Sequence, residues 1–317
     1  MDRPHLQNTF TAEALARVKR WYERVKAEAT DDTVWAVLDG AMLGREGSAQ
    51  LEACYGPPKR AFDETALAQY EELGLLLWPL SGLIAKDGLE TLRTTLSATP
   101  AVSFVRTAAS VKVLSEHLAW MAGALTSDGM KLFLRIGDTR VLPSVLSHFR
   151  DEQSLIMEAS VKEWIWPDRA SALRFAKADR VLTPQPLTAA LELDDAQYNA
   201  IFDDAAADIL HVELRRELPD WRDKRTGSEL HEWLQKVLER TRVLGLERLS
   251  DQVTFAALAL RTAGEFETAP ELGVTWLTVR GGSTGLGECI QQWGGREWDA
   301  LRRFQQRNAE VGGGGRT

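Results

Sequence analysis

The chain has 317 residues, 44% hydrophobic and 26% charged, which is ordinary for a globular protein and long enough for two domains. Its formal charge of −8 argues against a nucleic-acid partner, because such proteins usually present a basic face. No apolar run approaches the roughly 18 residues of a membrane-spanning helix, and the polar N-terminus predicts no secretory signal. We therefore expect a cytoplasmic protein that binds neither nucleic acid nor membrane.

Helix and strand patterns alternate through the first part of the chain. Apolar residues at helical spacing predict helices, whereas short apolar or alternating runs predict strands. Helices are expected over residues 12–28, 48–55, 87–96, 110–125 and 140–149. Strands are expected over residues 34–38, 60–63, 75–80, 101–106 and 131–136. This alternation favours an α/β lobe in which helices pack on a mixed sheet, without fixing the strand order.

Two prolines, Pro184 and Pro186, interrupt the chain, and only helical patterns follow them. Helices are expected over residues 193–218, 228–244, 249–263 and 296–308. We predict an α/β domain over 1–182, an all-α C-terminal domain over 187–310 and a flexible tail over 311–317. Limited proteolysis is expected to cut at the prolines or in the glycine-rich run 281–287.

The negative charge is uneven. Residues 1–185 carry 24 acidic and 22 basic side chains, and residues 186–317 carry 22 and 16. An acidic helical lobe is therefore expected, which would attract a basic segment of a partner and repel an acidic one.

The most specific local pattern is the run Lys131-Leu-Phe-Leu-Arg-Ile-Gly-Asp-Thr-Arg-Val-Leu142. It predicts a short strand that Gly137 ends, followed by a helix that Asp138 or Thr139 caps. Arg135 and Asp138 are close enough in sequence to form an ion pair across this corner.

Catalytic motifs are nearly absent from the sequence. The two cysteines, Cys54 and Cys289, are expected to stay reduced, and no histidine pair has metal-binding spacing. The run 281–287 suggests a phosphate loop, but Glu288 follows it where a lysine is needed, so a helix connector is favoured. We expect no enzyme activity, no cofactor and no metal. The alternative is a small-molecule enzyme with its site at the Arg135/Asp138 corner, where His148 would complete an acid–base pair.

Eleven tryptophans are many for one chain. Trp164 and Trp166 are two apart in the sequence, so in a strand they would share a face. That face either covers the edge of the core or presents aromatic anchors to a partner.

Several segments resemble one family in the same order. The pattern Arg135-x-x-Asp138-x-Arg140, between a strand and a Val-Leu helix, resembles the signature of the type VI secretion effector adaptors, catalogued as domain of unknown function 4123. Residues 34–41, with Asp39 and Gly40 near their end, resemble the family's opening strand. Residues 75–80 resemble a later strand, and Gln153 and the two tryptophans fit the end of the module. The resemblance spans about residues 30 to 175.

The resemblance implies a function. Members of this family are cytoplasmic adaptor chaperones that bind a toxic effector, often through its N-terminal part, and load it onto the VgrG-type spike. Asp39, Gly40, Arg135, Asp138 and Arg140 would then be structural or partner-binding signature residues rather than catalytic ones. We expect the α/β lobe to hold the effector, with Trp164 and Trp166 as candidate anchors.

Overall fold

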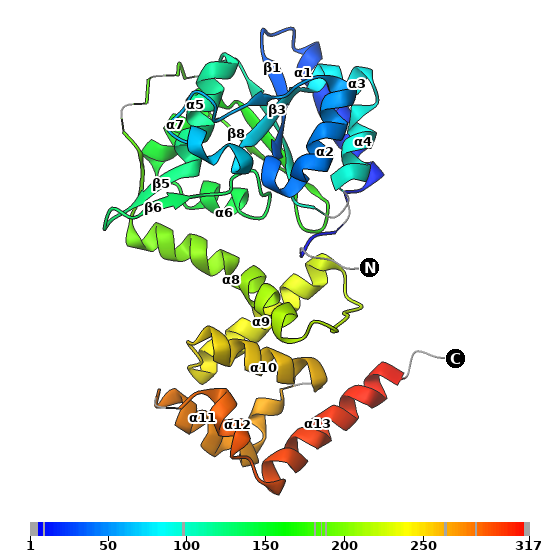
Figure 1. The fold of residues 1–317 in the computed structure, drawn as a ribbon, viewed down its shortest axis with the longest axis vertical. Coiled ribbons are helices and arrows are strands. Elements are labelled where there is room, and N and C mark those ends of the chain that lie inside the picture. Colours follow the sequence, from blue (N-terminus) through cyan, green and yellow to red (C-terminus); the bar gives the residue numbers. More distant parts are fainter. Residues whose placement is uncertain are drawn as a thin grey trace. The chain divides into compact units, whose positions relative to one another are not determined.

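The computed structural model describes residues 6–313 except 9, 97, 98, 181, 185, 188, 263, 264 and 283, and it leaves the side chains of 71 and 307–313 undescribed. The chain divides into two compact units, Met1–Ala205 and Ala206–Thr317 (Figure 1). The first unit is α/β and the second is all-helical, which confirms the predicted fold class.

The first unit is built on a six-stranded sheet in which every neighbouring pair of strands is antiparallel. Its strands, in spatial order, are β2 (Lys59–Arg60), β3 (Leu75–Pro79), β1 (Thr33–Asp39), β4 (Val102–Thr107), β7 (Glu163–Pro167) and β8 (Leu173–Lys177). A second sheet has the order β6 (Lys131–Phe133), β5 (Gly123–Thr126) and β9 (Leu191–Leu193). It alone is mixed, because β5 pairs with β6 antiparallel and with β9 parallel.

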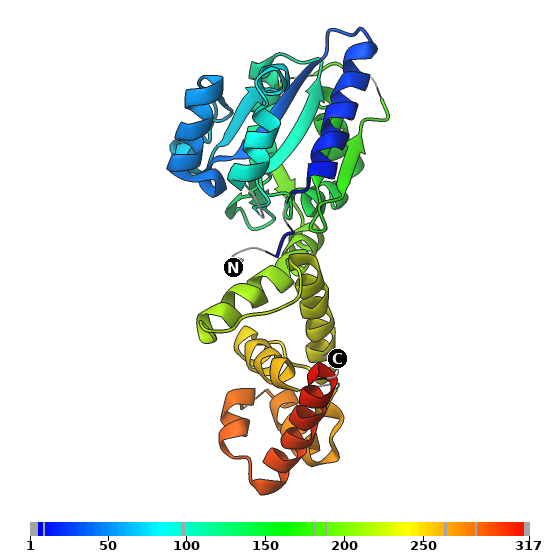
Figure 2. The same cartoon turned by 90° about the vertical axis from the view of Figure 1, so that its right-hand side faces the viewer.

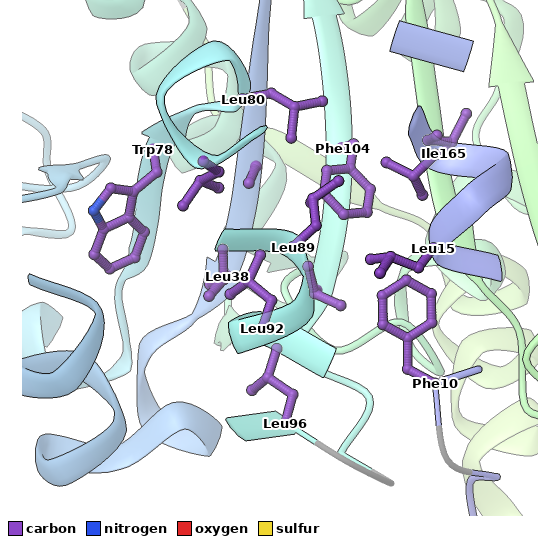
Figure 3. Close-up of a cluster of buried hydrophobic side chains, with 14 of the residues drawn as sticks. Phe10, Leu15, Leu38, Trp78, Leu80, Leu89, Leu92, Leu96, Phe104 and Ile165 are labelled. Atoms are coloured by element: carbon purple, nitrogen blue, oxygen red, sulfur yellow. The ribbon is translucent and has the colours of Figure 1, made fainter. Parts of the chain in front are cut away.

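Helices cover both faces of the large sheet. On one face lie α1 (Ala12–Ala27), α2 (Gly40–Tyr55), α3 (Leu80–Ala85) and α4 (Gly88–Leu96). On the other lie α5 (Val111–Ala122), α6 (Leu142–Ser147) and α7 (Asp151–Ser160). Alternate strand residues point to the two faces, so Leu38, Phe104 and Ile165 enter one core (Figure 3), whereas Val37 and Trp164 enter the other. Burial of both faces explains why these strands are almost continuously apolar.

The second unit contains the end of α8 (Asp195–Glu217), which begins in the first unit (Figure 2). The helices that follow are α9 (Gly227–Leu244), α10 (Leu249–Arg261), α11 (Gly273–Arg280), α12 (Leu286–Gln291) and α13 (Gly295–Gly313). Phe255, Phe266 and Trp276 form an aromatic cluster, and the Arg240 guanidinium lies 5.1 Å from the Phe255 ring centre. Among the described residues, no helix is long and apolar enough to cross a membrane.

The boundary between the units lies later than the proline segment. Pro184 and Pro186 belong to a loop between β8 and β9, and both strands are part of the first unit. The prolines therefore interrupt secondary structure inside a domain and do not separate two domains. Helix α13 also includes the first three residues of the predicted tail, whereas residues 314–317 lie outside the described part of the chain.

This boundary changes the distribution of charge. The second unit carries 17 acidic and 16 basic side chains, and the first carries 29 and 22. The expectation of an acidic helical lobe is therefore wrong, because the acidic residues that suggested it include five between 186 and 205. Nearly all of the net negative charge belongs to the α/β unit.

Candidate functional site

Asp39 connects three parts of the chain at the end of β1. Its Oδ1 accepts a hydrogen bond from the backbone N–H of Met42, 2.9 Å away, and so caps α2. The same oxygen accepts from Nη2 of Arg135 at 2.7 Å. The carboxylate is almost fully buried, since Asp39 is 1% exposed. Arg135 follows strand β6, so this ion pair joins segments that are 96 residues apart.

The expected ion pair between Arg135 and Asp138 is therefore wrong. Asp138 instead pairs with Arg140, whose Nε and Nη2 lie 3.0 and 2.6 Å from its two carboxylate oxygens. A tight turn explains the difference, because the N–H of Asp138 donates to the backbone carbonyl of Arg135. The two side chains leave this turn toward separate partners.

Two glycines allow the segments to approach one another. A Cβ atom on Gly40 would lie 2.7 Å from the carbonyl oxygen of Gly74. A Cβ atom on Gly137 would lie 2.6 Å from Cδ2 of Leu75 and 2.9 Å from Cβ of Asp39. Such distances are not tolerated, so both positions need glycine.

Five predicted signature residues thus gather at one place, which we call the signature corner: Asp39, Gly40, Arg135, Asp138 and Arg140. Arg135 is the accessible member, with a side chain that is 36% exposed. Its buried Nε and the buried Oγ1 of Thr139 have no hydrogen-bond partner among the described residues. The corner could therefore accept a polar group, although its two carboxylates are already occupied by arginines.

His148 does not complete an acid–base pair with Asp138. Its Nε2 lies 3.1 Å from Oδ2 of Asp204 in α8, and the hydroxyl of Ser144 donates to the same oxygen at 2.7 Å. Within the described part of the chain, His148 and Ser144 both contact Asp204 and form no hydrogen bond with each other. This arrangement lacks the serine–histidine hydrogen bond that activates a nucleophile. It ties α6 to the first half of α8.

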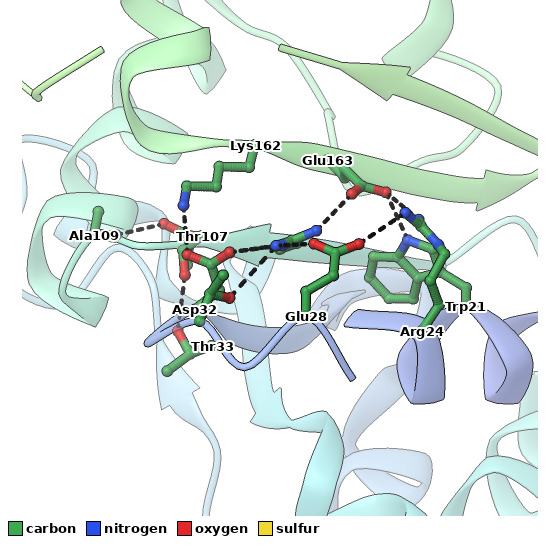
Figure 4. Close-up of polar contacts among 11 residues, drawn as sticks. Trp21, Arg24, Glu28, Asp32, Thr33, Thr107, Ala109, Lys162 and Glu163 are labelled. Carbon is green, nitrogen blue, oxygen red and sulfur yellow. Dashed lines mark hydrogen bonds and ion pairs between the residues drawn. The ribbon is translucent and has the colours of Figure 1, made fainter. Parts of the chain in front are cut away.

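A buried charged cluster, which the sequence analysis missed, lies at the other end of the sheet (Figure 4). Arg106 of β4 donates to Glu163 of β7 at 2.9 Å and to Asp32 at 2.7 Å. Glu163 also accepts from Trp21 and Arg24 of α1, at 2.8 and 2.7 Å. The cluster therefore fastens α1 to two strands. Charged residues inside otherwise apolar strands were the signal that could have revealed it.

The cluster is electrostatically balanced. Burial alone would raise the pKa of Asp32, but hydrogen bonds from Lys162 and Arg106 outweigh it and lower the pKa. Burial likewise opposes ionisation of Glu163, whereas hydrogen bonds from Trp21, Arg24 and Arg106 hold its pKa below the ordinary value. The carboxylates thus stay ionised beside the guanidinium at neutral pH.

Trp164 and Trp166 share a face of β7, as expected, but that face is inside the core. Trp164 is 0% exposed and donates from Nε1 to Oγ of Ser103 at 2.9 Å. Trp166 is also buried. Helices α5 to α7 cover this side of the sheet, so the burial excludes both tryptophans as surface anchors and supports the alternative of a core pair.

The glycine-rich run 281–287 links α11 to α12. The N–H of Leu286 donates to Asp251 at 2.7 Å, and that of Gly285 donates to Glu288 at 3.2 Å. Carboxylates of the chain itself therefore occupy the helix start where a phosphate would have to bind, which agrees with a connector; residue 283 lies outside the described residues. Among those residues, no group of three or more His, Cys, Asp or Glu side chains could hold a metal ion.

Two of the pockets in the first unit border elements described above. One, of about 500 Å³, is mostly apolar and is lined by His117 and Trp120 of α5, by Ile156 of α7 and by residues before and in β9, among them Leu187 and Glu192. The other, of about 460 Å³, adjoins the buried charged cluster and reaches Lys177 and Arg180. The signature corner contributes to neither pocket.

Comparison with known proteins gives one result. Residues 34–154 match the family model described as "Domain of unknown function (DUF4123)". This segment runs from β1 into α7 and contains all five residues of the signature corner. No curated protein and no solved structure matches the chain.

Proposed function

We propose that this protein is an adaptor that binds a toxic effector of the type VI secretion system and loads it onto the VgrG-type spike. One observation carries the proposal: the segments that resemble the adaptor signature lie far apart in sequence and meet in a single corner. The match of residues 34–154 to the DUF4123 model agrees with that resemblance. The resemblance supplies the function, with the effector and the spike as its partners.

The signature corner would serve this function as a structural joint. Asp39 and Arg135 hold the end of β1 against the turn before α6, and Asp138 and Arg140 brace the turn itself. Removing a member is then expected to lower stability and effector capture together.

A small-molecule enzyme is the second candidate. The unpartnered Nε of Arg135 and Oγ1 of Thr139 favour it, because they could hold a polar group of a ligand. Against it, both oxygens of Asp138 accept hydrogen bonds from Arg140, and Asp138 is 3% exposed. To act as an acid or base, Asp138 would first have to break its ion pair with Arg140.

Co-purification tests the proposal. The full-length protein carrying an affinity tag would be co-expressed with the protein encoded immediately downstream, and in a second culture with the VgrG-type protein of the same cluster. We expect stoichiometric capture of the downstream protein, and a ternary complex when all three are present. Failure to capture either protein would contradict the adaptor function. A neighbourhood of metabolic genes, with turnover that Arg135→Lys abolishes without loss of stability, would favour the enzyme.

A further inference from the structure

The large sheet has one open edge of appreciable length. Its two edge strands are β2, which has two residues, and β8, which has five. β8 pairs with β7 through hydrogen bonds that include Ala178 N to Lys162 O and Asp168 N to Ala172 O. In an antiparallel ladder the alternate residues face away from that neighbour. The backbone groups of Leu173, Phe175 and Lys177 therefore point outward, and they bond to no other segment in the described part of the chain.

One side chain, Phe175, distinguishes this edge from a protected one. Natural sheets often guard their edges with lysine or arginine, and Arg174 and Lys177 alone would fit that explanation. A protected edge does not need a large aromatic side chain in water, yet Phe175 lies at the centre of β8 and is 75% exposed. Its ring lies two residues from Lys177, so both point to the same side of the strand.

The charge around β8 is opposite to that of the rest of its unit. Residues 169–180 carry four basic side chains and one acidic side chain, Asp179, whereas the whole unit has 29 acidic and 22 basic. Arg174 pairs with Asp168. Lys177 and Arg180 are exposed, and within the described chain neither forms an ion pair. This edge therefore attracts acidic segments.

We propose that β8 is a docking edge for an extended, acidic segment of a partner protein, which adds to the sheet as a further strand. The partner would supply an apolar residue opposite Phe175 and an acidic residue two positions away, near Lys177. A second copy of this chain fits less well, because two such edges would bring Arg174, Lys177 and Arg180 of both copies together. The inference rests on the proposed function, in which the protein holds another protein.

A proline at position 175 is a selective probe of this edge. The outward N–H of Phe175 makes no bond to β7, so Phe175→Pro removes a docking group and leaves the internal ladder complete. Phe175→Val is the matched control, because it keeps the N–H and an apolar side chain that suits a strand. Lys177→Glu tests the charge independently.

The ligand would be a fluorescent peptide that repeats the sequence Thr-Val-Thr-Glu. A second peptide, with lysine in place of each glutamate, is the comparison. We expect the full-length protein to bind the glutamate peptide, and Phe175→Pro to weaken binding about tenfold, the value of a lost backbone hydrogen bond. Lys177→Glu should reverse the preference between the two peptides. Amide hydrogen exchange should slow at Phe175 and Lys177 and stay unchanged at Arg174 and Ala176, which already bond to β7.

Several results would overturn the inference. These are equal binding of both peptides, exchange that slows uniformly along β8, or no difference between Phe175→Pro and Phe175→Val. A dimer in sedimentation that Phe175→Pro abolishes would assign the edge to a second copy. The peptide assay is separate from effector capture: if an effector co-purifies equally well with Phe175→Pro, the adaptor function stands and the docking edge fails. If the protein binds the peptide but captures no effector, the docking edge stands and the adaptor function fails.

Discussion

At the scale of single residues, the ion pair between Arg135 and Asp39 makes a prediction. Arg135→Ala leaves the buried Asp39 carboxylate with fewer donors, so we expect the free energy of unfolding to fall by about 2 kcal/mol. Combining Arg135→Ala with Asp39→Asn should show a coupling energy of about 1 kcal/mol or more. The measurement is urea denaturation of the single and double variants.

Asp138 provides the control for that cycle. Because Asp138 pairs with Arg140 and not with Arg135, the cycle of Arg135→Ala with Asp138→Asn should show coupling of no more than about 0.5 kcal/mol. A larger coupling energy between Arg135 and Asp138 than between Arg135 and Asp39 would instead support the local ion pair that the sequence suggested.

The charged cluster predicts how stability depends on pH. The pKa values of Asp32 and Glu163 lie below their ordinary values of 3.8 and 4.5, so the folded protein binds fewer protons than the unfolded chain near these values. Their contribution to stability is complete above the ordinary values and is lost as the pH falls through the lower, folded-state pKa values. We expect the unfolding free energy to decline from about pH 5 downward.

Arg106→Lys tests this cause. One ammonium group cannot reproduce the forked contacts to Asp32 and Glu163, so both pKa values should rise and the decline below about pH 5 should become shallower. Denaturation at several pH values would measure the slope. Arg45→Lys is the matched control, since Arg45 pairs with Glu72 on the surface. An unchanged slope in Arg106→Lys would mean that other carboxylates govern acid unfolding.

At the scale of elements, the turn before α6 depends on close packing at Gly137. Gly137→Ala would place its Cβ against Leu75 and Asp39, so we expect a loss of about 1–3 kcal/mol. Gly82→Ala in α3 meets no atom within 4 Å and should be neutral or stabilising by up to about 1 kcal/mol. Thermal unfolding would compare the two variants. Equal melting temperatures would show that the residues around Gly137 can move to accommodate a Cβ atom.

The elements also show what the sequence could predict. Long helices and strongly apolar strands, such as α1, β1, β3 and α10, lie close to their expected ranges because periodicity over many residues identifies them. The helix expected over 110–125 instead ends at Ala122, and the apolar residues that follow form β5. Short elements with weak patterns, including β8, β9 and α12, were missed.

The candidate site was also predictable only in part. The members of the signature corner were identified from local motifs, but their pairing was not. Arg135 and Asp138 are three residues apart, which favours a local ion pair, whereas the real partner of Arg135 lies 96 residues away. Periodicity contains no information about such long-range contacts. The face shared by Trp164 and Trp166 was predicted from strand geometry, but its burial depends on helices from elsewhere in the chain.

At the scale of the whole molecule, the domain boundary can be tested by truncation. A fragment of residues 1–217 keeps β9 and α8, whereas a fragment of 1–186 loses both. The shorter fragment lacks the buried Leu191 and Leu193 and the hydrogen bond from Gln197 to Gln153. We expect 1–217 to unfold cooperatively and 1–186 to be less stable by several kcal/mol, at about 1.5–3 kcal/mol for each buried leucine. Circular dichroism during heating would measure the melting temperatures of the two fragments. Equal melting temperatures would support a domain junction at the prolines.

The long separation of Asp39 and Arg135 has a consequence for the order of folding. Closing a loop of 96 residues costs chain entropy that few contacts offset early in folding. We therefore expect the corner to form after the transition state, so that Arg135→Ala leaves the folding rate nearly unchanged. Its effect should fall on unfolding, which a loss of about 2 kcal/mol accelerates roughly 30-fold. With this order of folding, the corner would limit how often the α/β unit opens.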